Sequence, residues 1–171
     1  MPTPIGHALA GVAVAGAGRG LSIPPRHVAI LALCAAAPDL DLALRLFDGV
    51  NHHRGASHSL AAALIVGFAA FLLRKTGFDL PSAASMAAAW ASHVLLDYLG
   101  LDTSPPSGEM ALWPFSTGFY ASPVPIFYDI PRSFSPGAIR HNLLAVAIEV
   151  VVLAPVAFLC WRSRGASSRR A

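Results

Sequence analysis

Three of the seven histidines in the chain lie close together, within residues 51–59. They are His52, His53 and His58, and an apolar run from residue 60 to residue 73 follows them directly. Neutral imidazole is the commonest metal ligand in proteins. Ionisable groups beside a long apolar segment are costly in free energy and tend to mark function. The pattern predicts a metal centre and raises the question of which other residues complete it.

A second pair of chemically capable residues, His93 and Asp97, lies in a later apolar run. Because residues four apart project from the same face of an α-helix, these two side chains can bind one divalent cation together. The alternative is an internal hydrogen bond between the imidazole and the carboxylate, without a metal. For His53 and His58, a shared site is favoured over two separate structural roles.

Three further candidates stand alone in the sequence. His7 lies in a first apolar run rich in glycine and alanine, where it can also bond to a neighbouring carbonyl group. Asp39 follows Pro38 and can equally be a turn or cap residue, and Asp41 suits a cap or a carboxylate that orients a ligand. His52 is expected to be a solvated loop residue and is left out of the site.

Five apolar runs must position these residues. They are residues 5–18, 27–37, 59–73, 82–101 and 143–161. A membrane-spanning helix needs about 20 apolar residues, and only the fourth and fifth runs reach that length. The first three either extend through polar ends shielded by protein or are half-buried helices. The alternatives are five embedded helices, or four spans with a re-entrant first segment.

The composition indicates a membrane protein. Of the 171 residues, 55% are hydrophobic and 12% are charged, whereas a soluble domain carries about 25% charged residues. The predicted fold is therefore an all-α, polytopic membrane bundle of about five helices. Residues 1–161 form the single domain, residues 102–140 a long aromatic-rich loop within it, and residues 162–171 a basic, frayed tail.

The net charge of +3 predicts no nucleic-acid partner, because the basic residues form no cluster interleaved with aromatic residues. Cys34 and Cys160 each lie inside an apolar run and are expected to act as small hydrophobic residues.

Charge placement predicts the orientation of the bundle. One set of alternate connections, with the tail, carries eight basic residues: Arg19, Arg26, Arg74, Lys75, Arg162, Arg164, Arg169 and Arg170. The other set carries four: Arg45, Arg54, Arg132 and Arg140. Because the richer side faces the cytoplasm, the C-terminus is expected inside and the N-terminus outside.

The candidate residues fall on one side of this topology, the non-cytoplasmic one, although the charge count did not presuppose it. They are His7, Asp39, Asp41, His53, His58, His93 and Asp97. A shared depth favours one site over unrelated structural roles for each residue.

These residues also carry a resemblance to a known family. The matching elements are the Pro4 to His7 start, the Pro38-Asp39-Leu40-Asp41 turn, the His53-Arg54-Gly55-Ala56-Ser57-His58-Ser59 segment, the Ser92-His93 to Asp97 helix and Trp113-Pro114-Phe115-Ser116. Over residues 1–116 the chain resembles the YdjM-type family, bacterial inner-membrane proteins described as LexA-regulated, metal-dependent hydrolases. The order of histidines and aspartates is also distantly similar to zinc-dependent phospholipases C.

The resemblance implies a function and a set of metal ligands. The implied ligands are His7, Asp39, His53, His58, His93 and Asp97. It implies a hydrolase of the bacterial inner membrane and gives no substrate. Four histidines and two carboxylates exceed the needs of one tetrahedral zinc ion. The set suits two metal ions that share a bridging ligand, and the expected cofactor is one or two divalent ions, with zinc as the metal.

Phosphoester hydrolysis of a membrane lipid is the chemistry that such a centre suits best, because paired metal ions clamp both oxygens of an in-line displacement. Two catalytic candidates accompany the ligands. Arg54 can hold a phosphate oxygen or anchor the chain at the headgroups. Asp41 can orient the attacking water or a ligating histidine.

The aromatic residues between 113 and 134 suit either a plain interfacial loop or a lid over the site. The alternative function is transport or handling of a metal ion or small solute. Against it, Glu149 is the one polar residue that continues a path toward the cytoplasmic half. A structural protein with one stabilising metal is a further alternative. The oligomeric state stays open.

Overall fold

The computed structural model describes residues 1–18, 25–73 and 80–168, and these residues are helical or irregular. The α-helices are α1 (Pro4–Ala17), α2 (Pro25–Ala36), α3 (Arg45–Asp48), α4 (Leu60–Leu72), α5 (Leu80–Tyr98) and α6 (Pro136–Ser168), and the 3-10 segments are η1 (Ala37–Leu44) and η2 (Ala56–His58). The β pairing of the described residues amounts to two isolated bridges. The all-α prediction is therefore confirmed.

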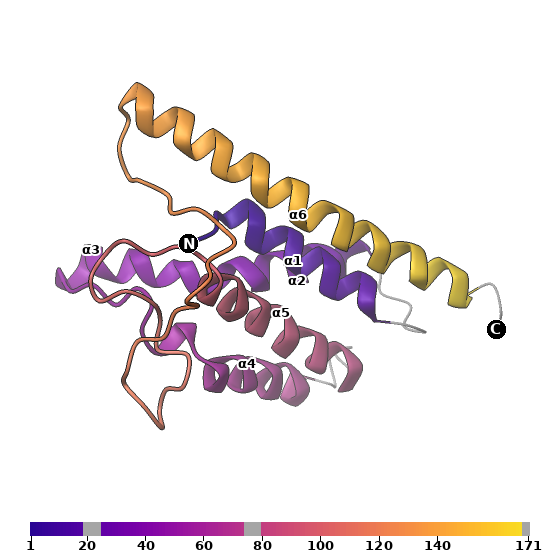
Figure 1. Ribbon diagram of the computed structural model, residues 1–171. Helices are drawn as coiled ribbons and strands as arrows, with labels where there is room; N and C mark the ends of the chain where they lie inside the picture. The colour runs from indigo at the N-terminus through magenta and orange to yellow at the C-terminus, as the bar shows by residue number, and fades with distance from the viewer. Residues whose placement is uncertain (19–24, 74–79, 169–171) are drawn as a thin grey trace.

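The helices lie roughly side by side, with α1 in the middle of the bundle (Figure 1). Helix α1 packs against α2, α5 and α6, and α4 packs against α5. The start of α1, the start of α4 and the end of α5 all lie at the end of the bundle where the long loop between α5 and α6 folds over it (Figure 1). The fold thereby brings the segments that carry His7, His58 and His93 to one end.

Small residues allow the helices to approach closely. A Cβ added at Gly11 in α1 would lie 2.7 Å from the Cα of Ala32 in α2. A Cβ added at Gly67 in α4 would lie 2.7 Å from the Cβ of Ala87 in α5. Backbones in van der Waals contact are typical of helices that associate without a hydrophobic driving force between them.

The second helical arm takes the longer of the two forms that the sequence left open. The second run can end at a turn at residues 38–41 or extend through them, and α2 continues through η1 into α3 without leaving a helical conformation. Pro38 is the second residue of η1 and contributes no N–H group to the helical hydrogen bonds. The arm ends at Gly49, whose φ of +74° is the left-handed conformation of a helix C-terminus.

The last helix also differs from its predicted bounds. Helix α6 begins at Pro136, inside the predicted loop of residues 102–140, and continues to Ser168, through most of the predicted frayed tail. It continues past Pro155, which lies in its interior. Five of the basic residues used for orientation lie outside the described residues: Arg19, Arg74, Lys75, Arg169 and Arg170.

Within the part of the chain that the structure describes, two helical stretches are long and apolar enough to cross a membrane, Arg26–Asp48 and Pro136–Ser163. From the sequence we expected this length in the fourth and fifth apolar runs. The structure shows it in the second and the fifth. The second gains its length from η1 and α3, whereas α5 does not reach the required hydropathy. Helices α1 and α4 are shorter apolar helices. Large side chains such as Phe68 on α4 and Phe158 on α6 are about 60% exposed, which leaves an apolar outer surface.

The close approach of α1 to α2 generates a prediction. Gly11→Ala places a methyl group into the backbone of Leu31 and Ala32, so we expect a lower melting temperature in detergent and a lower yield of folded protein. A loss of about 1–3 kcal/mol is typical of overpacking. Gly137→Ala is the matched control, because its Cβ would meet no atom within 4 Å. Equal melting temperatures of the two variants would contradict this packing.

Candidate metal centre

Two buried histidines, His58 and His93, present the same ring nitrogen to the centre of the cluster. His93 Nδ1 lies 2.8 Å from the carbonyl oxygen of Ala35, and His58 Nδ1 lies 3.1 Å from Asp41 Oδ2. Both oxygens accept, so both Nδ1 atoms donate, and both Nε2 atoms face the centre of the cluster. A hydrogen bond of this kind on the far nitrogen is the usual support of a metal-binding histidine.

Two carboxylates face these free nitrogen atoms. Asp39 Oδ1 lies 3.7 Å from His58 Nε2 and 3.7 Å from His93 Nε2. Asp97 Oδ2 lies 3.5 Å from His58 Nε2 and 3.3 Å from His93 Nε2. Ligands about 2.0–2.1 Å from a tetrahedral zinc ion lie roughly 3.3 Å from one another. The spacing of the four donor atoms therefore fits the coordination shell of one ion.

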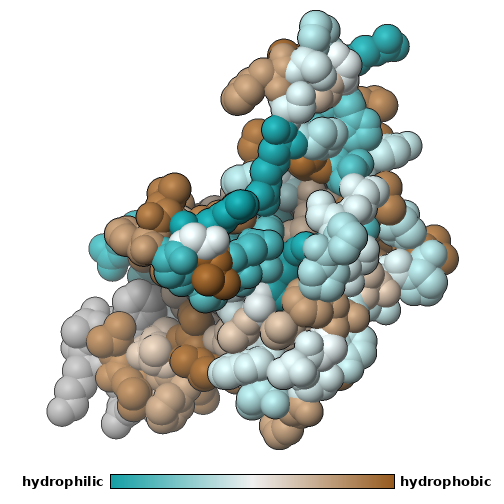
Figure 2. All heavy atoms as spheres, turned by 90° about the vertical axis from the view of Figure 1, so that its left-hand side faces the viewer, coloured by the Kyte–Doolittle hydropathy of each residue, from teal (hydrophilic) through white to brown (hydrophobic). Residues whose placement is uncertain are grey.

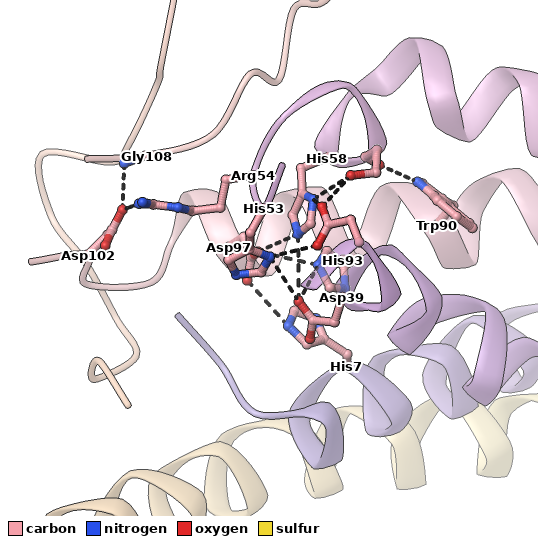
Figure 3. A network of polar contacts seen from close by, with 12 residues as sticks. His7, Asp39, His53, Arg54, His58, Trp90, His93, Asp97, Asp102 and Gly108 are labelled. Carbon is pink, nitrogen blue, oxygen red and sulfur yellow. Dashed lines mark hydrogen bonds and ion pairs between the residues drawn. The ribbon is translucent and has the colours of Figure 1, made fainter. Parts of the chain in front are cut away.

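The four residues of this group, which we call the Asp39–Asp97 group, are Asp39, His58, His93 and Asp97. They come from three segments of the chain: Asp39 from η1, His58 from η2, and both His93 and Asp97 from α5. His93 and Asp97 project from one face of α5, as their spacing predicts. Figure 3 shows the side chains pointing toward one another.

His7 and His53 lie at the edge of the Asp39–Asp97 group. The His7 ring stacks on the His93 ring with centroids 3.7 Å apart, and its Nε2 lies 3.3 Å from Asp97 Oδ1. His53 Nδ1 lies 2.9 Å from Asp41 Oδ1 and 4.0 Å from Asp39 Oδ1. The structure thus brings all six expected ligands together.

Asp41 connects three side chains around the cluster. Besides its contacts with His53 and His58, it accepts a 2.6 Å hydrogen bond from Ser57 Oγ. It forms a second possible metal group with His53 and His58, but its oxygens already bond to their Nδ1 atoms. Asp41 is therefore placed to orient histidines, one of the two roles considered from the sequence.

Local structure fixes the segment that carries His58. Ser59 caps α4, because its side chain accepts a 3.0 Å hydrogen bond from the N–H of Ala62. Trp90 of α5 donates a 2.8 Å bond to the carbonyl of Ser57. The imidazole is therefore held directly before the start of α4 and against α5.

Burial and charge both act on His58. Burial lowers its pKa, but the carboxylates of Asp39 and Asp41 outweigh burial and raise the pKa to about 10. The surroundings of the imidazole thus favour positive charge, whether a proton or a metal cation supplies it.

The cluster contains an unusual number of unpaired polar atoms. Among the described residues, the buried atoms without a hydrogen bond include His7 Nδ1 and Nε2, His58 Nε2, His93 Nε2, and both carboxylate oxygens of Asp97. Most buried polar atoms in proteins have a partner, and each unmade bond costs about 1–3 kcal/mol. A cation at this position gives the donor atoms the partner that the chain does not supply.

Arg54 points away from the cluster (Figure 3). Its guanidinium is paired with the Asp102 carboxylate and donates to the carbonyl of Ser104 at 3.3 Å. The side chain is 5% exposed, and burial lowers the pKa of the guanidinium. Its partners thus engage the guanidinium that we expected to contact a phosphate.

A pocket of about 830 Å³ opens beside the cluster. Asp39, His53 and Arg54 contribute to its wall, and the loop contributes Asp129 and Arg132. From this end of the bundle, hydrophilic side chains occupy the middle of the face, with hydrophobic ones around them (Figure 2). The Asp39 side chain, 19% exposed, connects the buried group to the pocket.

Other polar residues have structural roles. His52 pairs with Asp48 at 2.5 Å in solvent, and His141 bonds to the carbonyl of Asp129 at 3.0 Å. Glu149 accepts hydrogen bonds from the N–H and the hydroxyl of Thr3, at 2.8 and 2.5 Å. It therefore anchors the start of α1 and is not part of either possible metal group.

Sequence reasoning missed two residues near the site. Glu109 in the loop is 1% exposed, and both its carboxylate oxygens lack a hydrogen-bond partner among the described residues. Arg132 lines the pocket. Neither lies in a helix or a motif, so the sequence offers no periodicity that would have placed them.

The fold and the cluster define an all-helical protein with an apolar outer surface and a buried group of metal-type ligands at one end. The chain belongs to the YdjM inner membrane protein family, whose model matches residues 1–167. That match extends the predicted resemblance, which covered residues 1–116, to almost the whole chain. No curated protein and no solved structure matches the chain. The likeness to phospholipases C stays a prediction.

The geometry of the Asp39–Asp97 group predicts how metal content responds to mutation. Purified wild-type protein should contain about one zinc ion per chain by elemental analysis. His93→Ala removes one of four donor atoms, so we expect metal content to fall below about a tenth of that value. His141→Ala is the control, because this histidine bonds to a carbonyl outside the group. Full metal content in His93→Ala would contradict the assignment.

Proposed function

We propose that this protein is a membrane-bound, metal-dependent hydrolase that cleaves phosphoester bonds in a lipid substrate. The supporting observation is the Asp39–Asp97 group, whose four donor atoms are spaced for one divalent cation. Two nitrogen and two oxygen donors suit zinc. When bound, zinc supplies a Lewis acid that polarises a phosphoryl oxygen and lowers the pKa of a water molecule.

We propose one ion in the Asp39–Asp97 group. A second ion at Asp41, His53 and His58 would have to displace the contacts of Asp41 with both Nδ1 atoms, at 2.9 and 3.1 Å. Those contacts instead fix the orientation of the two imidazole rings. His7 and His53 then serve as polar groups at the edge of the site, which can hold water or a phosphoryl oxygen.

The pocket supports a substrate with an anionic headgroup. Its volume of about 830 Å³ lies within the range of small-molecule sites. Asp102 is paired with Arg54. Arg132 places a second guanidinium on the wall of the pocket, and a guanidinium binds phosphate oxygens well. Phosphate is thus the headgroup chemistry we infer.

The placement of the site supports a lipid as the carrier of that group. At 1.5 Å per residue, the 14 residues of α1 and the 13 of α4 span only about 20 Å, less than the hydrocarbon core of a membrane. The cluster lies at the ends of these helices. Phe47, Phe115 and Phe134 are 86%, 94% and 96% exposed, and such side chains suit insertion at an interface.

We infer a multi-pass topology with the site on the non-cytoplasmic side of the inner membrane. The helices run back and forth along the bundle, so the ends that carry the cluster all lie at one end of it (Figure 1). The sequence assigns the excess of basic residues to the opposite end, and the side with more basic residues faces the cytoplasm.

Transport is the alternative, and the packing beyond the cluster argues against it. On the far side of His93 along α5, Ala89 packs with Ala15, Leu31, Cys34 and Ala35 in a buried apolar group. An ion leaving the Asp39–Asp97 group toward that end would meet no polar side chain among these residues. The site is thus open toward the pocket on one side and closed by apolar side chains on the other.

The hydrolase proposal makes a prediction about lipid cleavage. His58→Ala should lower phosphate release from short-chain phospholipids and polyprenyl phosphates by at least about a hundredfold, while the variant stays folded in detergent. A purely structural metal would instead give a lower melting temperature and yield. Metal-loaded wild type that cleaves no phosphoester in a broad panel, but carries zinc into liposomes, would favour transport over hydrolysis.

The orientation makes a separate prediction. A reporter that is active only in the cytoplasm, fused after Ala171, should be active in cells, because five crossings from an external N-terminus leave the C-terminus inside. The same reporter inserted at Gly137, at the start of α6, should be silent, because this position is expected outside. Positions after Ser107 or Gly118 are less suitable, because an insertion there would interrupt the loop. Activity at Gly137 and silence after Ala171 would reverse the orientation.

A further inference from the structure

Glu109 is held in a fixed position beside the segment that carries His58. It forms an isolated antiparallel bridge with Tyr120, with N···O distances of 3.0 and 2.9 Å. The next two residues bond to the histidine segment, because Met110 N–H donates to the carbonyl of Arg54 and Leu60 N–H donates to the carbonyl of Ala111. The loop is therefore attached at both ends of residues 54–60.

The side chain of Glu109 is buried without a partner. It is 1% exposed, and neither carboxylate oxygen accepts a hydrogen bond among the described residues. Glu149 is equally buried, at 1%, but both of its oxygens accept from Thr3. The comparison shows how this fold treats a structural carboxylate. A buried carboxylate left unpaired calls for a different explanation.

The charges that act on Glu109 belong to the metal centre. Burial is the largest cause that raises its pKa, to about 9, and the negative charge of Asp97 raises it further. His58 acts in the opposite direction. The Arg54 guanidinium, on the neighbouring segment, is engaged by Asp102. A cation in the Asp39–Asp97 group would therefore add positive charge on the side of Glu109 where His58 and Asp97 act.

Glu109 does not belong to the inner set of donors. Neither possible metal group, each defined by ligand atoms within 4.8 Å of one another, includes it. One water molecule between the carboxylate and the ion would donate a hydrogen bond to an oxygen of Glu109. The same water molecule would occupy one coordination position of the ion. A charged acceptor makes such a hydrogen bond strong.

We propose that Glu109 belongs to the cation centre and completes it from the loop side, by accepting a hydrogen bond from a water molecule that faces the ion. Glu109 is then a positioning residue that sets how tightly the centre holds its metal. The inference rests on the cation site of the proposed function, but not on the hydrolysis of any substrate.

The test measures zinc affinity and the stability of the metal-free protein on the same samples. Zinc dissociation constants come from competition with a chelator in detergent, and melting temperatures from the metal-free protein. For Glu109→Gln and Glu109→Leu we expect an affinity weaker by about 10–100-fold, the usual effect of losing a carboxylate outside the ligand set. The metal-free Glu109→Leu protein should melt at the same temperature as wild type or higher, because an unpaired buried acid is removed.

Glu149→Gln is the matched control, with the opposite pattern. It weakens the anchor of Thr3, so its metal-free form should melt at a lower temperature, while its zinc affinity stays within about threefold of wild type. Unchanged zinc affinity in both Glu109 variants would overturn the inference. A Glu109→Leu protein that melts well below wild type, and whose zinc affinity changes no more than that of Glu149→Gln, would also overturn it. That result would show that Glu109 stabilises the fold and does not act on the metal.

The outcomes separate this inference from the proposed function. If wild type holds zinc and the Glu109 variants hold it weakly, the inference stands even when no lipid is cleaved. If wild type binds no zinc, the cation site itself is wrong, and the inference fails with it.

Discussion

The constraint on which the rest of the structure depends is electrostatic. Four ligand atoms face one another in a buried space, and together they favour a positive charge between them. The Nε2 atoms of His58 and His93 each lie 3.3–3.7 Å from a carboxylate oxygen of Asp39 and one of Asp97. Hydrogen bonds on the far nitrogens fix the rings so that the Nε2 atoms point inward. Such an arrangement needs a positive charge between the donor atoms, from a proton or a metal cation, because buried charge and unpaired polar atoms are costly.

The helix bundle places these four ligand atoms close together by bringing the segments that carry them to one end. Glycines such as Gly11 and Gly67 let the helices approach until their backbones nearly touch. Helix α1 is anchored by the contacts of Thr3 with Glu149, and α4 begins at the Ser59 cap directly after His58. The loop between α5 and α6 folds over this end, and the pocket that Asp39 reaches lies there. Each of these features helps to fix the position of the segments that carry the ligand atoms.

Much of the helical layout could be predicted from hydrophobic runs, and the pairing of His93 with Asp97 from helical spacing. The bounds were harder, because Pro38 suggests the end of a helix in sequence but is the second residue of a 3-10 segment that continues α2 in the structure. The role of Arg54 could not be predicted, since its partner Asp102 lies far along the chain in an irregular loop. Glu109 was missed for the same reason. Its position depends on a bridge to Tyr120 that no local pattern signals.

The central claim is that His58, His93, Asp39 and Asp97 bind one metal ion, and X-ray absorption at the zinc edge tests it most directly. We predict a first shell of nitrogen and oxygen atoms only, at about 2.0–2.1 Å, with outer-shell scattering from two imidazole rings. In His93→Ala the zinc absorption itself should nearly vanish, because that variant is expected to lose its metal. A shell that contains sulfur at about 2.3 Å, and so involves Cys34 or Cys160, would contradict the account. So would a spectrum without imidazole scattering.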